Sequence, residues 1–120
     1  IKRALRLRLS KTISSAGLAL LESDPVPPEE IWCLQQVRWT IDTALGGGNY
    51  RARLLIQQGN VSEPLEQEDD PTPGQVYSYE DDVWLYESEQ LVLQLDQAAA
   101  SAVAQMWARG YRVPSRVGVS

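Results

Sequence analysis

Residues 25–42 read Pro-Val-Pro-Pro-Glu-Glu-Ile-Trp-Cys-Leu-Gln-Gln-Val-Arg-Trp-Thr-Ile-Asp, a proline-bearing bend followed by a long run of alternating side chains. The apolar side of this run consists of Ile31, Cys33, Val37, Trp39 and Ile41. The polar side consists of Gln36, Arg38, Thr40 and Asp42. Because successive side chains of a strand point to opposite faces of a sheet, this period predicts a strand with one buried and one wet face. Such a strand is typical of an antiparallel β-sandwich.

The start of the chain has the same period of two. Leu5, Leu7 and Leu9 alternate with Arg6 and Arg8, which predicts a strand with a leucine face and a basic face. We expect this basic segment to be either an edge strand or an arm. Basic residues on an edge strand also discourage uncontrolled pairing with other chains.

Several later segments are also patterned as strands. Leu18 and Leu20 indicate a short strand, and the residues from Tyr50 to Ile56 indicate a longer one. We predict that the longer one forms a hairpin with the strand before it, across the glycine-rich turn at 45–49. Residues 91–95 alternate leucine with other side chains. The chain as a whole is therefore predicted to be all-β, with a jelly-roll-like sandwich as its architecture.

Residues 59–75 differ from these segments in being polar and acidic. Pro64, Pro71 and Pro73 punctuate them, and proline cannot donate a hydrogen bond within a sheet. We therefore predict a long exposed acidic loop. Its acidic run at 68–70 lacks the alternating ligands and the central glycine of a calcium-binding EF-hand loop, so no metal site is predicted.

Residues 96–110 fit two structures. The helical spacing of Ala99, Ala102, Val103 and Met106 favours a helix, with Asp96 and Gly110 as caps. Alternation gives a strand instead, with Ala102, Ala104, Met106 and Ala108 on one side. Because every other patterned segment of the chain is a strand, consistency favours the strand.

Length and charge narrow the class of protein. The 120 residues suit one sandwich domain at 14–120 preceded by the basic strand or arm at 1–13. A net charge of −5 argues against general nucleic-acid binding, which needs a broad basic face. Positive charge gathers at the start of the chain, whereas acids fill residues 63–89. These are either two solvated faces, or a basic arm that meets the acidic patch of a neighbouring subunit.

The residue types argue against catalysis. The chain has no histidine, its single cysteine, Cys33, lies on the apolar side of its strand, and its only lysines are Lys2 and Lys11. The usual general base, metal ligand and thiol nucleophile are therefore missing, and we predict a protein that is not an enzyme, with no catalytic residues and no cofactor. No apolar run approaches the roughly 20 residues that cross a bilayer, so no membrane contact is expected.

The aromatic residues suggest a binding role as one alternative. The four tryptophans and five tyrosines, with no phenylalanine, combine apolar rings with polar donors. On a sandwich, Trp32, Trp84, Trp107 or Tyr86 would stack on sugar rings if several of them shared one exposed face. The other interpretation places these rings in the core or in a subunit interface.

The strand-entry patterns resemble the small β-sandwich, jelly-roll-like structural proteins of tailed bacteriophages, which include capsid decoration (cement) proteins and related head or tail accessory proteins. The segments that carry the resemblance are residues 26–37, 50–56, 87–93 and 107–113. One departure is Pro28-Glu29-Glu30, where a proline-glycine-glutamate turn would be expected.

The resemblance implies a virion structural protein that binds and stabilises a phage capsid without catalysis. It would be assembled in the host cytoplasm as part of the virion, beside the major capsid protein or other virion proteins, and would form a homo-oligomer, with a trimer favoured. A neck or tail component and a carbohydrate-binding β-sandwich module remain the alternatives. The expected subunit or capsid interface consists of Lys2, Arg3, Leu5, Arg6, Leu7, Arg8, Leu9, Trp32, Leu34, Trp84 and Trp107.

Overall fold

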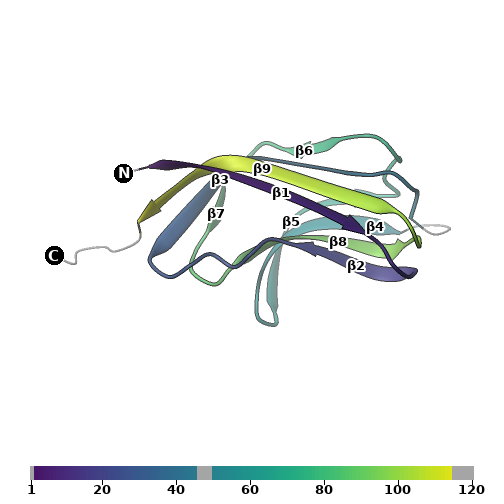
Figure 1. Ribbon diagram of the computed structural model, residues 1–120, viewed down its shortest axis with the longest axis horizontal. Coiled ribbons are helices and arrows are strands. Elements are labelled where there is room, and N and C mark those ends of the chain that lie inside the picture. The colour runs from purple at the N-terminus through teal and green to yellow at the C-terminus, as the bar shows by residue number, and fades with distance from the viewer. Residues whose placement is uncertain (1, 46–49, 115–120) are drawn as a thin grey trace.

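The computed structural model describes residues 2–45 and 50–114, which form two antiparallel sheets that face each other (Figure 1). Sheet A contains β1 (Arg3–Thr12), β9 (Val103–Pro114) and β3 (Glu30–Ile41), with β6 (Tyr77–Tyr79) and β7 (Val83–Leu85) both paired to β3. Sheet B contains β2 (Gly17–Glu22), β8 (Gln90–Ala98), β4 (Arg51–Gln58) and β5 (Val61–Asp69). Across these two ranges, no helix is long and apolar enough to cross a membrane.

The strand order is that of a jelly roll. Sheet A follows the order β1-β9-β3-β6, and sheet B follows the order β2-β8-β4-β5. Since β6 and β7 share the free edge of β3, four strand positions face four, as in eight-stranded double-sheet jelly rolls. The predicted fold class, an antiparallel jelly-roll-like sandwich, is confirmed. The predicted hairpin is wrong, because β3 and β4 lie in different sheets, and the turn assigned to 46–49 lies outside the described residues.

A bulge divides β3 into two parts. The register of β3 with β9 shifts between Leu34 and Gln36, so that Gln35 is an extra residue in the ladder. The side chains of β3 that belong to the core are Trp32, Leu34, Val37, Trp39 and Ile41. The extra residue therefore moves the core face from even to odd positions. The prediction that Trp32 and Leu34 face a partner is corrected, since both are buried within the sandwich.

Cys33 is buried on the outer face of sheet A, not in the core. Its neighbours in register are Tyr111 on β9 and Trp84 on β7. The rings of Tyr111 and Trp84 meet edge to face with their centroids 6.2 Å apart, so they cover the thiol from both neighbouring strands. The neighbouring Cys33 thiol and, to a smaller extent, burial raise the pKa of the Tyr111 hydroxyl. The cysteine is thus a small packed side chain under two rings.

The opening segment is an edge strand. β1 pairs with β9 along its whole length, from Arg3 to Thr12, so the alternative of a separate arm is set aside. Leu5 lies in the core, and Leu7 and Leu9 pack against it. The prediction that these leucines meet a partner is corrected for Leu5, which is buried, and for Leu9, which packs on the core. Leu7 packs on the core and also reaches the lining of a surface pocket described below. The arginines between them point outward, as the period of two requires.

The acidic segment at 59–75 is not a loop throughout, and that prediction is wrong. Residues 61–69 form β5, which pairs with β4 at the edge of sheet B. Pro64 lies where the register with β4 shifts, opposite Leu55. A proline is tolerated there because an edge strand at a bulge does not need every backbone donor. The predicted exposure is correct for Glu63 and Asp69, whose side chains remain exposed.

The ambiguous segment at 96–110 is extended, as the alternation favoured. β8 ends at Ala98, and after a turn β9 begins at Val103. Ala102, Ala104, Met106 and Ala108 are all buried. The alternating pattern therefore outweighs the helical spacing, because a strand here completes sheet A between β1 and β3.

β9 approaches β3 very closely at Gly110. A Cβ built on Gly110 would lie 1.8 Å from the backbone oxygen of Cys33, well inside van der Waals contact. A glycine within a strand often marks such a close approach of another backbone. Gly110 therefore lets β9, which carries Trp107 and Arg109, lie against the bulged part of β3.

Candidate ligand-binding face

The outer face of sheet A gathers arginines around one tryptophan. The register places Arg8, Trp107 and Arg38 in one row across β1, β9 and β3. It places Arg6, Arg109 and Gln36 in the next row. Directly opposite residues of neighbouring antiparallel strands have Cβ atoms roughly 5 Å apart, so these six side chains share one surface.

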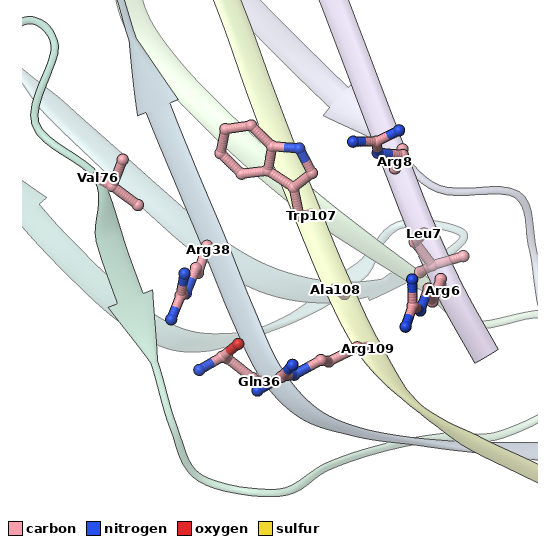
Figure 2. Close-up of a pocket in the computed structure, with 9 residues that line it drawn as sticks. All are labelled: Arg6, Leu7, Arg8, Gln36, Arg38, Val76, Trp107, Ala108 and Arg109. Atoms are coloured by element: carbon pink, nitrogen blue, oxygen red, sulfur yellow. The ribbon is translucent and has the colours of Figure 1, made fainter. Parts of the chain in front are cut away.

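This surface contains a pocket of about 610 Å³, which we call the arginine groove. Its lining residues are Arg6, Leu7, Arg8, Gln36, Arg38, Val76, Trp107, Ala108 and Arg109. Figure 2 shows Trp107 in the middle, with Arg38 and Gln36 of β3 on one side and Arg6 and Arg8 of β1 on the other. Val76, in the segment leading into β6, forms a further wall and is 51% exposed. A pocket of this size accommodates a small ligand or part of a chain.

The groove is strongly positive. Among the residues that the structure describes, none of the arginines at positions 6, 8, 38 and 109 forms an ion pair within 4.0 Å. No carboxylate belongs to the lining. Four positive charges therefore converge on one surface of a protein whose net charge is −5.

Glu80 is the acid associated with this face, and it is held by neutral partners. Its carboxylate accepts hydrogen bonds from Gln36 Nε2 at 3.1 and 3.0 Å and from the hydroxyl of Ser78. These bonds from Ser78 and Gln36, with smaller contributions from the charges of Arg38 and Arg109, lower the pKa of Glu80. Glu80 therefore stays ionised near the groove without closing an ion pair to either arginine.

The predicted interface residues divide between the groove and other places. Four of them, Arg6, Leu7, Arg8 and Trp107, line the groove. Lys2 lies 4.6 Å from the centroid of the Tyr111 ring, and Arg3 is exposed opposite Arg112. Trp84 is 42% exposed and packs edge to face on Tyr111, outside the groove.

Sequence reasoning missed Gln36, Arg38, Val76 and Arg109 as members of a site. The signal for two of them was present, since Gln36 and Arg38 lie on the polar side of the long strand. Only the pairing of β3 with β9 shows that this polar side continues onto the arginines of β1. Register of this kind cannot be read from a single sequence.

A second pocket, of about 310 Å³, lies near β5 and β7. Its lining combines the rings of Trp84 and Tyr86 with the carboxylates of Glu63, Asp82 and Glu89. In the part of the chain that the structure describes, no group of three or more histidine, cysteine, aspartate or glutamate side chains is placed to hold a metal ion. This pocket is acidic where the arginine groove is basic.

Comparisons with known proteins assign no family. No protein-family model matches the chain, and no curated protein matches its sequence. One solved structure that is similar to the chain is described as "CBM4 structure and function", with a TM-score of 0.40 and 13% identity, over 88% of this chain and 83% of that chain. A likeness at this identity and TM-score says nothing about ligands.

Proposed function

We propose that the protein is a noncatalytic β-sandwich module that binds carbohydrate in the arginine groove. The observation that carries the proposal is the position of Trp107, a half-buried indole in the middle of the groove with polar planar side chains on both sides. An indole offers an apolar face together with a polar tip. A sugar ring stacks on such a face while its hydroxyl groups reach the amide of Gln36 and the guanidinium groups beside it.

The other tryptophans are less suited to this role. Trp39 is buried and stacks on Tyr77, and Trp32 is buried with its indole nitrogen donating to Glu30 at 3.0 Å. Trp84 is exposed, but its ring packs at right angles to the Tyr111 ring, and the pocket that it lines is acidic. Trp107 is therefore the residue on which we place sugar stacking.

The groove supports binding without bond cleavage. Glycoside hydrolysis usually requires two carboxyl groups on either side of the scissile bond. The lining of the groove contains no carboxylate, hydroxyl or thiol side chain. We therefore propose that the groove holds a glycan and leaves it intact.

A glycan array tests the proposal. We expect the wild-type chain to bind a subset of glycans, and Trp107→Ala to lower the affinity for them by at least about tenfold. Trp84→Ala is the matched control, since it removes an exposed indole from outside the groove and should leave the affinity unchanged. Silence of the wild-type chain across a broad array would contradict the proposal, as would loss of binding only in Trp84→Ala.

A second candidate is a virion structural protein, either a capsid decoration protein or a neck or tail component. The observation that favours it is the separation of charge between the two sheets. The arginine groove lies on sheet A, whereas β5 at the edge of sheet B carries Glu63, Glu66, Glu68 and Asp69. Copies of the chain would then associate with the basic face of one against the acidic edge of the next.

Light scattering and capsid binding test this second candidate. It predicts a stable homo-oligomer that is weakened when Arg6 and Arg8 are both changed to Glu, because the reversed charges repel the acidic edge. The corresponding reversal of Arg51, which is paired with Asp69 at the acidic edge, should not weaken the oligomer, because it makes that edge more negative. A monomer that does not bind capsids would rule this candidate out.

A further inference from the structure

We propose that the ligand of the arginine groove is an acidic glycan, a chain whose sugar rings carry carboxylate groups. This inference rests on the proposed carbohydrate-binding function and adds the charge of the ligand. It is motivated by a feature that sugar stacking alone does not explain: four guanidinium groups surround one indole, and within the described residues none of them has an acidic partner in the fold. A neutral glycan would need hydrogen-bonding groups but no net charge.

The arrangement of the arginines is unfavourable for the protein by itself. Arg6 and Arg109 are directly opposite in register, and like charges in directly opposite positions destabilise a sheet. The chain contains 16 aspartate and glutamate residues, yet none of them lines the groove. Carboxylates of a ligand would supply the missing negative charge, and would relieve the repulsion between the facing guanidinium groups.

The geometry of guanidinium groups favours carboxylate as that negative group. Arginine presents a planar fork of donors that matches a planar carboxylate with two parallel hydrogen bonds. Arg8 and Arg38 lie on either side of Trp107 in one row, so a ring stacked on the indole has a fork on each side. Carboxylates on the stacked sugar or on its neighbours in the chain are therefore within reach of both strands.

The negative charge of Glu80 should affect the binding of acidic and neutral ligands differently. Its carboxylate accepts hydrogen bonds from the amide of Gln36, and the charges of Arg38 and Arg109 help to lower its pKa. An acidic ligand in the groove would be repelled by Glu80 and would compete for Gln36. Exchange of Glu80 for glutamine removes the negative charge and keeps a carbonyl oxygen that can accept from Gln36. It should therefore strengthen the binding of an acidic glycan and leave the binding of a neutral glycan nearly unchanged.

The rest of the chain disfavours a nucleic acid as the occupant. Extended polyanions need basic residues over a broad surface, because binding gains affinity with each phosphate that is neutralised. Here the net charge is −5, and the exposed edge strand β5 is acidic. One short basic groove suits a few charges along a glycan better than a continuous phosphate backbone.

Calorimetric titration with matched oligosaccharides tests the inference. The probes are oligogalacturonate and the same oligosaccharide with its carboxylates methyl-esterified, which preserves the rings and removes the charge. We expect the ester to bind at least about tenfold more weakly than the acid. We also expect Glu80→Gln to tighten binding of the acid only, and Arg38→Ala or Arg109→Ala to weaken the acid more than the ester. Arg53→Ala, on sheet B, is the control and should change neither.

Each alternative outcome has a defined meaning. Equal affinity for the acid and its ester overturns the inference but leaves carbohydrate binding in place. Binding of neither probe, together with silence on a broad glycan array, overturns the proposed function as well. Tighter binding of dextran sulfate or of single-stranded DNA, lost in Trp107→Ala, would show that the groove serves a different anion and would also overturn the carboxylate assignment. Circular dichroism of each variant confirms that the sandwich is folded.

Discussion

The arginines of the two sheets have different surroundings. On sheet B, Arg51 lies 3.6 Å from Asp69 of β5, and Arg53 lies 3.8 Å from Asp96 of β8. On sheet A, the arginines of the groove have no such partner among the described residues, although the sheet has the same antiparallel pairing. The arginines of sheet B are thus paired with carboxylates of the fold, whereas the arginines of the groove on sheet A are not.

The unpaired positive charge on sheet A is not needed for folding. Exposed ion pairs contribute only about 0–1 kcal/mol, so the pairs on sheet B are modest stabilisers at most. The facing guanidinium groups on sheet A oppose folding slightly. We therefore propose that the arginines of the groove serve a ligand and not the stability of the fold.

The largest expected effect concerns the framework that carries the groove. In Gly110→Ala, the new Cβ would collide with the backbone oxygen of Cys33, so β9 could not keep its place against β3. We expect the free energy of unfolding in urea to fall by about 3 kcal/mol or more. Ala108→Gly, on the same strand, is the control and should cost only about 1 kcal/mol. A Gly110→Ala variant as stable as the wild type would show that β9 and β3 are not packed as described.

The next effect compares charge reversal on the two sheets. Arg38→Glu should lower the affinity for oligogalacturonate by more than about 100-fold, because it replaces an attractive charge in the groove by a repulsive one. Arg53→Glu, on sheet B, should leave that affinity unchanged. Titration calorimetry measures both variants. Similar losses in the two variants would mean that general charge, and not the groove, attracts the ligand.

Neutralising one arginine on each sheet should change the free energy of unfolding by smaller amounts and in opposite directions. Arg6→Gln removes one of two facing guanidinium groups, so the free energy of unfolding should rise by about 0.2–1 kcal/mol. Arg51→Gln removes the partner of Asp69, so the free energy of unfolding of this variant should fall by up to about 1 kcal/mol. Urea unfolding at low salt measures both. If Arg6→Gln is the more destabilising of the two, the charge of Arg6 contributes to the stability of the fold.

The smallest effect that we expect is a change in the pKa of Glu80. The pKa of Glu80 is lowered in the folded protein, so its ionised form stabilises the fold above the pKa of the unfolded chain. That contribution is lost as the pH falls through the lower, folded-state pKa. In Arg109→Gln, we expect the pKa of Glu80, followed by NMR, to rise towards its usual value, whereas Arg51→Gln should not change it. An unchanged pKa in Arg109→Gln would show that the charge of Arg109 does not act on this carboxylate.

The strands of the sandwich could largely be predicted from the alternation of apolar and polar residues. Which side chains of each strand point into the core could not. The bulge at Gln35 moves the core face from Leu34 to Val37, and the adjacent polar pair Gln35 and Gln36 was its only trace in the sequence. Pro64 pointed to a loop, whereas an edge strand tolerates it. Both errors arise because pairing with a neighbouring strand, which a single sequence does not specify, decides where an extra residue or a missing donor is acceptable.

The candidate site could be predicted only in part. Arg6, Arg8 and Trp107 were expected to contact a partner, and they lie together in the groove. Arg38 and Arg109 were not expected, because their proximity depends on the register of β9 with β3. Leu5 and Trp32 were placed at an interface and belong to the core, since burial of an apolar face takes precedence over exposure at an edge.

We propose that the outer face of sheet A holds the ligand, and the indole N–H signals of the tryptophans report directly on where the ligand binds. In a two-dimensional NMR spectrum, titration with oligogalacturonate should shift the indole signal of Trp107. The signals of Trp32 and Trp39, which are buried in the core, should stay in place. A shift confined to Trp84, or no shift of Trp107 at saturating ligand, would show that the ligand does not bind in the arginine groove.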